Sequence, residues 1–196
     1  MAAYLLCSQR FKIYNSEILK IMKKSILSLF LVTLTTFGAI NAQDAAQAKS
    51  GLPVVNVKAL DGKVVSTSTI VNDGKPMIVS FWATWCKPCV NELSAINEVY
   101  ADWTAETGVK LVAISIDDAR TMSSVAPFVN GKGWNYDVFL DPNGDLKRAM
   151  NVNMVPHTFL INGKGEIIDQ HTSYAPGDED KLFEKVKKTA AGQPLN

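Results

Sequence analysis

The chain has 196 residues and a formal net charge of +1 at pH 7, with 47% hydrophobic and 20% charged residues. This balance is typical of a globular domain and excludes a disordered or fibrous chain. Without residues 1–42, 15 basic and 18 acidic residues remain, a formal charge of −3, which argues against binding to nucleic acid or to an anionic membrane.

The N-terminal segment predicts a secretory signal peptide. Residues 22–24 (Met-Lys-Lys) are basic, residues 25–40 are mostly Ile, Leu, Phe, Val and Thr, and cleavage is expected after Ala42. The apolar run is shorter than the about 20 residues of a membrane-spanning helix, so cleavage is favoured over a retained anchor. Because residues 1–21 make an unusually long extension before the basic start, we expect translation to begin at Met22.

Cleavage predicts a periplasmic or otherwise extracytoplasmic protein, whereas an uncleaved segment would anchor it to the membrane. Loss of residues 1–42 also removes Cys7 and leaves two cysteines, in a compartment where disulfides persist. Residues 43–52 are small and polar and predict a flexible lead-in. A single domain is therefore expected over residues 53–196.

Short apolar runs after the lead-in predict strands. Residues 54–60 and 64–67 flank an Asp-Gly pair, which predicts a β-hairpin. The runs at 77–83 and 111–116 are apolar almost throughout, as expected of strands that are covered on both faces. These runs favour a largely parallel sheet with helices on either side.

An amphipathic helix is predicted between the two apolar runs. Leu93, Ile96, Tyr100 and Trp103 recur every three or four residues, and Gly108 marks the expected end. A strand, a helix and a strand in this order form a βαβ unit.

The remaining elements follow from turn residues and charge. We expect a helix over residues 121–129, a turn at 141–144 and a hairpin formed by strands at 158–161 and 166–170. Three acidic residues begin the last helix, at 178–180, and lysines follow near its end, which is the order that the helix dipole favours. The sequence contains no internal repeat.

Cys86 and Cys89 form a C-x-x-C motif at the start of the predicted helix. This spacing suits the about 4.4–6.8 Å between Cα atoms that a disulfide needs, so the pair can open and close in place. Cys89 shares the apolar face of the helix, and Cys86 is expected at its exposed tip. The helix dipole and Lys87 stabilise a thiolate, which predicts Cys86 as the nucleophile and Cys89 as the resolving thiol.

Other uses of the motif are less favoured. A zinc site needs four ligands, and only Cys86, Cys89, His157 and His171 remain in the mature chain. A permanent structural disulfide would close almost no loop and would stabilise little. A copper-binding metallochaperone that uses both cysteines and His157 is kept as an alternative of a different class.

Two motifs carry a resemblance to a known family. The segment Phe81–Cys89 (FWATWCKPC) resembles the active-site signature of the thioredoxin superfamily, and Val155–Phe159 (VPHTF) resembles its cis-proline loop. The signal peptide, the first hairpin and the stretch between Asp117 and Phe139 resemble the extracytoplasmic TlpA/ResA branch. The resemblance implies an α/β, thioredoxin-like three-layer sandwich: a mixed central sheet flanked by helices, with an N-terminal β-hairpin and a central insertion.

The same resemblance implies an extracytoplasmic thiol-disulfide oxidoreductase, an enzyme that reduces protein disulfides and takes part in cytochrome c maturation. Its implied partners are protein disulfides, apocytochrome c among them, and a membrane thiol donor. It would need no cofactor beyond the Cys86–Cys89 disulfide, and we expect a monomer. Because a stabilised thiolate makes the pair more oxidising, a thiol oxidase or isomerase is kept as an alternative. A peroxidase is not favoured, since Val79 and Ala83 replace the Pro and Thr of the peroxiredoxin motif.

The resemblance also implies substrate-binding residues. Val155, which precedes the cis Pro156, would offer its backbone N–H and C=O to an extended substrate segment beside Cys86. Trp85 is expected to shield the disulfide. His157 is equally well explained as a rim residue that contacts substrate and as an inert exposed histidine.

The proton acceptor stays open. Glu92 lies one helical turn after Cys89 and matches a glutamate that ResA-like proteins carry near the buried cysteine, where it assists proton transfer. An exposed helical glutamate is the alternative. Thioredoxin has a buried aspartate six residues before its first cysteine, where this chain has Ser80, so Glu92 is expected to replace it. For His171 we expect an ordinary core or surface position.

Overall fold

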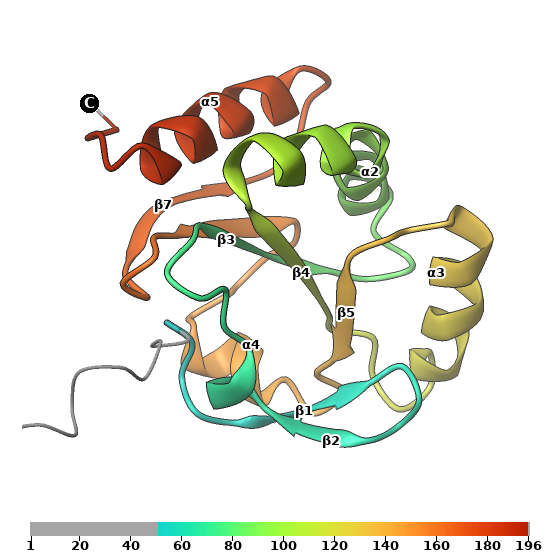
Figure 1. Ribbon diagram of the computed structural model, residues 1–196. Helices are drawn as coiled ribbons and strands as arrows, with labels where there is room; N and C mark the ends of the chain where they lie inside the picture. The colour runs from blue at the N-terminus through green and yellow to red at the C-terminus, as the bar shows by residue number, and fades with distance from the viewer. Residues whose placement is uncertain (1–50, 196) are drawn as a thin grey trace, which may run out of the picture. The chain divides into compact units, whose positions relative to one another are not determined.

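The computed structural model describes residues 51–195 (Figure 1). The predicted signal peptide, the start at Met22 and residues 43–50 of the lead-in lie outside the described residues. In chain order the elements are β1 (Asn56–Ala59), β2 (Val64–Ser66), η1 (Thr67–Thr69), β3 (Met77–Trp82), α2 (Lys87–Thr107), β4 (Lys110–Ser115), η2 (Met122–Ser124), α3 (Val125–Lys132), β5 (Asp137–Leu140), α4 (Asp145–Ala149), β6 (His157–Ile161), β7 (Ile167–Thr172) and α5 (Asp178–Ala190).

The strands form one mixed sheet in the order β2-β1-β5-β4-β3-β6-β7. Only β3 with β4 and β4 with β5 pair in parallel, and the other neighbours pair antiparallel. The expectation of a largely parallel sheet is therefore wrong, whereas the mixed sheet with flanking helices is confirmed. Parallel neighbours need a crossover, which α2 and α3 provide, and the short turns at either end of the described chain give antiparallel hairpins.

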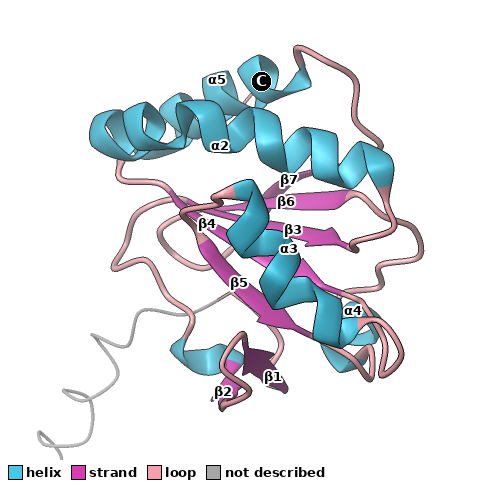
Figure 2. Cartoon of the chain, turned by 90° about the vertical axis from the view of Figure 1, so that its right-hand side faces the viewer, coloured by secondary structure: helices cyan, strands magenta, loops and turns pink. Residues whose placement is uncertain are grey.

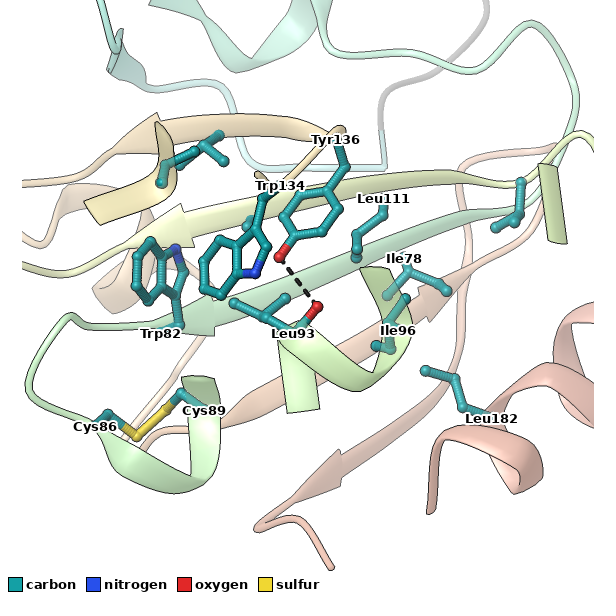
Figure 3. Packing of buried hydrophobic residues seen from close by; sticks show 14 of the residues in the cluster. Ile78, Trp82, Cys86, Cys89, Leu93, Ile96, Leu111, Trp134, Tyr136 and Leu182 are labelled. Atoms are coloured by element: carbon teal, nitrogen blue, oxygen red, sulfur yellow. Dashed lines mark hydrogen bonds between the residues drawn. A yellow bond between two sulfur atoms is a disulfide. The ribbon is translucent and has the colours of Figure 1, made fainter. Parts of the chain in front are cut away.

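Two apolar cores lie on opposite faces of the sheet because successive strand residues point to opposite sides. On β3, Ile78 and Trp82 join the core that contains residues of α2, α3 and α5, here named the α2-side core (Figure 3). Val79 and Phe81 join the second core with Leu146 of α4. Figure 2 shows α2 and α5 together over one face of the sheet. The strand that leads to the C-x-x-C motif is thus covered on both faces.

Helix α2 begins immediately at the motif. Cys86 is its N-cap residue, and Pro88 lies in the first turn, where the missing N–H of proline costs no helical hydrogen bond. The helix ends at Gly108, whose φ of 66° gives the left-handed C-cap and whose N–H donates to the Thr104 carbonyl at 2.8 Å. The predicted helix and its predicted end are confirmed.

Other boundaries differ slightly from expectation. Both predicted hairpins form, but the helix expected over residues 121–129 is the short η2 turn followed by α3. The five-residue helix α4 was not predicted, and Leu52, expected in the lead-in, is buried in the second core. Within residues 51–195, no helix combines the length and apolar character needed to cross a membrane.

Candidate active site

Cys86 and Cys89 form a disulfide at the N-terminus of α2, with their Cα atoms 5.3 Å apart. Cys86 keeps 6% of its surface exposed and Cys89 none. The expected order of exposure is confirmed, but the expectation of an exposed tip at Cys86 is wrong. Its sulfur is bonded to that of a fully buried residue and lies in the α2-side core (Figure 3). Of the two bonded cysteines, Cys86 is the one that keeps some exposed surface.

A buried carboxylate holds the loop in front of the disulfide. Asp117 follows β4, is fully buried, and accepts hydrogen bonds from the Thr84 N–H at 2.9 Å and the Thr84 hydroxyl at 2.6 Å. The Ser115 hydroxyl donates to the same carboxylate at 2.8 Å. The Cys86 N–H donates to the Ala83 carbonyl at 3.0 Å, which closes the turn between β3 and α2. Sequence analysis did not assign Asp117 this role.

The proline loop lies next to the strand that leads to the disulfide. The Val155–Pro156 peptide bond is cis, Pro156 is buried and Val155 is half-buried. Strand β6 begins at the next residue, His157, which pairs with Phe81 of β3. The fold therefore brings together the two motifs that are about 70 residues apart in the sequence.

Aromatic side chains around the motif differ in exposure. Trp85 is 62% exposed, so most of its indole faces solvent, and Met154 beside the proline loop is also exposed. Trp82 is fully buried, with its ring centroid 4.9 Å from that of Trp134. His157 is half-buried; its ring stacks on Phe159 and its Nε2 lies 3.1 Å from the side-chain oxygen of Gln170.

Glu92 is 1% exposed, so the alternative of an exposed helical glutamate is wrong. Its Oε1 lies 2.9 Å from the Thr158 hydroxyl and 2.8 Å from Nε2 of His171. Its Oε2 is buried and has no hydrogen-bond partner among residues 51–195. The Thr158 hydroxyl is also 2.9 Å from the hydroxyl of Ser80. A single hydroxyl thus connects Glu92 to the position where thioredoxin has its aspartate.

Sequence analysis missed Thr158 and His171 as partners of Glu92. Strand pairing explains their position: Ser80 of β3 pairs with Thr158 of β6, and Thr158 pairs with His171 of β7. Residues paired in this way point to the same face of a sheet. Alternation along each predicted strand shows which residues share a face. It identifies Ser80, Thr158 and His171 as neighbours only once the strand order is known.

The surroundings of Glu92 are strongly desolvated. Burial and, to a smaller extent, the charge of Glu92 raise the pKa of Tyr136 well above its ordinary value of 10.0. The Tyr136 hydroxyl donates to the carbonyl of Leu93, the residue that follows Glu92, at 3.2 Å (Figure 3). A charge on Glu92 therefore acts on its neighbours with little screening by water.

Comparisons with known proteins agree with this geometry. A family model described as the AhpC/TSA family matches residues 49–170. The chain is 29% identical to the sporulation thiol-disulfide oxidoreductase A of Bacillus subtilis, over 83% of this chain and 97% of the relative. It is 31% identical to the thiol-disulfide oxidoreductase ResA of Oceanobacillus iheyensis, over 75% and 78%. The solution structure of a thioredoxin-like protein from Porphyromonas gingivalis has a TM-score of 0.66 and 50% identity, covering 74% of this chain and 94% of that one.

Proposed function

We propose that this chain, which belongs to the AhpC/TSA family and is a thiol-disulfide oxidoreductase of the thioredoxin-like, ResA-like kind, acts as a disulfide reductase outside the cytoplasm. The observation that carries the proposal is the unequal burial of the two bonded cysteines at the start of α2. It leaves one sulfur open to exchange and keeps the other inside. The Cys86–Cys89 pair itself carries the two electrons in its dithiol form.

The cycle starts with the Cys86 thiolate, which attacks one sulfur of a substrate disulfide, forms a mixed disulfide and releases the first substrate thiolate. Cys89 then loses its proton and attacks the Cys86 sulfur, which forms the Cys86–Cys89 disulfide and releases the second substrate thiolate. The protein dithiol gives up two electrons and the substrate disulfide gains them. The two protons lost by the cysteines balance those that the substrate thiolates take up.

Glu92 is the proton acceptor for Cys89 in this proposal. It lies one turn further along α2, on the same buried side, and its Oε2 has no competing hydrogen bond within the described chain. Through the Thr158 hydroxyl, Glu92 is connected to Ser80, the position of the buried aspartate in thioredoxin. This supports the view that Glu92 on the helix does here what the strand aspartate does in thioredoxin.

The proline loop and its neighbours would bind the substrate. Val155 lies directly before the cis Pro156, where an extended segment could pair with its backbone as an added strand. Trp85 within the first motif and Met154 directly before the second add exposed apolar surface. Main-chain pairing next to apolar surface suits unfolded or extended protein segments of many sequences.

Location and partners rest on the N-terminal sequence and the family. The basic and apolar pattern of residues 22–42, which lie outside the described residues, supports export and cleavage. Protein disulfides are the substrates. Apocytochrome c as one of them, and a membrane thiol protein as the electron donor, complete the proposal.

The direction of exchange is tested by the reduction potential of the Cys86–Cys89 pair. The exposed Lys87 and the helix N-terminus both stabilise the Cys86 thiolate and shift the pair toward oxidase behaviour. Equilibration of the purified protein with glutathione buffers, read as thiol content by mass, gives the potential. A value near that of thioredoxin, about −270 mV, is expected for a reductase, and a value near about −120 mV would contradict the proposal in favour of an oxidase.

A further inference from the structure

Three polar residues form a row across the sheet beneath Glu92. Ser80 on β3, Thr158 on β6 and His171 on β7 are paired in register, and β6 lies between the other two strands. Next to Ser80 and Thr158 on the same face lie Ile78, Trp82 and Leu160 of the α2-side core, so this part of the row crosses an apolar surface. Buried polar groups cost free energy unless they are hydrogen-bonded, and here the hydrogen bonds run from Ser80 through Thr158 to Glu92 and from Glu92 to His171.

His171 is the end of the row that reaches solvent. The side chain of Glu92 is 2% exposed, whereas that of His171 is 27% exposed. The imidazole borders a pocket of about 160 Å³ between β7 and α5, lined also by Asp178, Lys181 and Lys185. Figure 1 shows α5 lying along β7 beside α2. The buried carboxylate is therefore one hydrogen bond away from a group in contact with water.

The bond between the two residues can hold a proton at either end. Nε2 of His171 lies 2.8 Å from Oε1 of Glu92. An ionised Glu92 accepts a hydrogen bond from the Nε2–H, and a protonated Glu92 donates one to the bare Nε2. The two states differ in the tautomer of His171, since Nε2 can accept a proton only when the neutral ring carries its hydrogen on Nδ1.

The other charged groups that face this pocket have partners of their own. Lys181 pairs with Asp178 at 2.8 Å and Lys185 with Asp169 at 2.6 Å. The hydrogen bond with Lys181 is the main reason that the pKa of Asp178 lies below its ordinary value, and the charge of His171 adds a smaller lowering.

Close to this pocket in the sequence, the Tyr174 hydroxyl donates to the Glu179 carboxylate at 2.8 Å. Among the described groups that face His171, Glu92 is thus the one that is bonded to it directly.

We propose that His171 is a positioning residue that relays protons between Glu92 and solvent. The proposal rests on the proposed function, since it needs Cys89 to give its proton to Glu92. The proton moves from the Cys89 sulfur to Oε2 of Glu92 and is brought to Oε1 by rotation of the carboxyl group. It then passes to the bare Nε2 of a neutral His171 that carries its hydrogen on Nδ1, and the imidazolium that forms releases the Nδ1 proton to water in the pocket. Exchange of the ring hydrogen with the same water restores the starting tautomer. No electrons move in these steps. The substrate can therefore cover the disulfide without blocking the exit of the proton.

The test measures the two exchange steps separately. Reduced protein is mixed with oxidised glutathione and quenched with acid at set times, and the mixed disulfide and the internal disulfide are quantified by mass. In His171→Ala, decay of the mixed disulfide is expected to slow on the order of tenfold at neutral pH, less than the about 10²–10⁴-fold effect of a group that contacts the reacting atoms. Formation of the mixed disulfide, which uses Cys86, is expected to be unchanged.

The pH profile and imidazole separate a relay from a structural role. The defect of His171→Ala should shrink above pH about 8.5, where a thiol ionises without help, and added imidazole should restore decay at neutral pH. His171→Gln keeps a hydrogen-bond donor of similar reach but cannot carry a proton, so it should stay slow. Lys181→Ala alters the charge of the same pocket and should leave both steps unchanged.

The relay is wrong if His171→Gln resolves the mixed disulfide at the parent rate, if the defect of His171→Ala is the same at every pH, or if Lys181→Ala slows decay equally. These outcomes leave the proposed function intact as long as the parent protein forms and resolves the mixed disulfide. A parent protein that does neither would remove the proposed function as well.

Discussion

Asp117 and Glu92 are both buried carboxylates near the disulfide, but they are bonded in different ways. Both oxygens of Asp117 accept hydrogen bonds, two from Thr84 and one from Ser115. In Glu92, one oxygen holds both partners and the other has none within residues 51–195. In Asp117 each oxygen has at least one hydrogen-bond donor, whereas in Glu92 one buried oxygen has none within residues 51–195.

The difference separates a structural acid from a reactive one. Asp117, just after β4, accepts two hydrogen bonds from Thr84, which lies two positions before Cys86. It therefore holds the loop in front of the disulfide in place. Glu92 is tied to a histidine that reaches solvent, and its spare oxygen can take up a proton. A buried carboxylate whose two oxygens are both hydrogen-bonded holds the loop, and one with an unbonded oxygen is available for proton transfer.

The largest expected effect is on stability, at Asp117. Asp117→Ala leaves two hydroxyls and one backbone N–H without their acceptor in a buried place, which should lower the free energy of unfolding by about 3 kcal/mol. Urea unfolding followed by circular dichroism measures it. Asp118→Ala is the matched control, since the ion pair of this neighbouring acid is with the exposed Arg120, and its urea midpoint should hardly change. Equal midpoints for the two variants would contradict the structural role of Asp117.

At Glu92 we expect a large effect on the rate of exchange and a small effect on stability. Glu92→Gln should change the free energy of unfolding by less than about 1 kcal/mol, because it removes a buried charge that is only half bonded. Resolution of the mixed disulfide should slow about 100-fold, because Cys89 loses its proton acceptor. Stopped reactions with oxidised glutathione give the rate. A stable variant that resolves at the parent rate would exclude Glu92 as the acceptor.

A smaller effect is expected from removing the hydroxyl groups that hydrogen-bond to the two carboxylates. Thr158→Val and Ser115→Ala each remove a buried hydroxyl donor and should cost about 1–1.5 kcal/mol of stability. Only Thr158→Val should also slow resolution, because its hydroxyl bonds to Glu92 rather than to Asp117. Unfolding and single-turnover measurements on both variants test this. Equal slowing in the two would remove the distinction.

The smallest expected effect is on the pH dependence of stability, where Tyr136 tests how strongly the surroundings of Glu92 are desolvated. Burial and then the charge of Glu92 raise the pKa of Tyr136, so the folded protein keeps its proton where the unfolded chain loses it. The stability that this provides is complete below pH about 10 and is lost as the pH rises further. Between pH 9 and 11, the parent should therefore lose about 1 kcal/mol more stability than Tyr136→Phe. Identical pH slopes in urea unfolding would contradict the desolvated environment.

The fold and the cysteine pair could be predicted from the sequence because their signals are local. The apolar run of β3, the helical spacing that follows it and the C-x-x-C motif lie within 27 residues, Met77–Trp103, and each constrains the next. The hairpins follow from short turn motifs in the same way. The short helix α4 lacks the length to show a helical period and was missed.

Burial and cross-strand contacts could not be predicted in this way. The helical spacing placed Glu92 near the apolar face but did not decide between burial and exposure. His171 became its partner only through the pairing of β6 with both β3 and β7, which joins residues 79 positions apart. For Cys86 the exposure was overestimated, since the helical position was considered without the bond to a buried sulfur.

The most direct test of the central claim is the trapping of the mixed disulfide. Reduced Cys89→Ser and Cys86→Ser proteins are each mixed with oxidised glutathione, and the adducts are counted by mass. If Cys86 is the nucleophile and Cys89 resolves, Cys89→Ser accumulates one glutathione on Cys86, and Cys86→Ser gains none over the same time. Equal adduct formation by the two variants would contradict the division of roles between Cys86 and the more deeply buried Cys89.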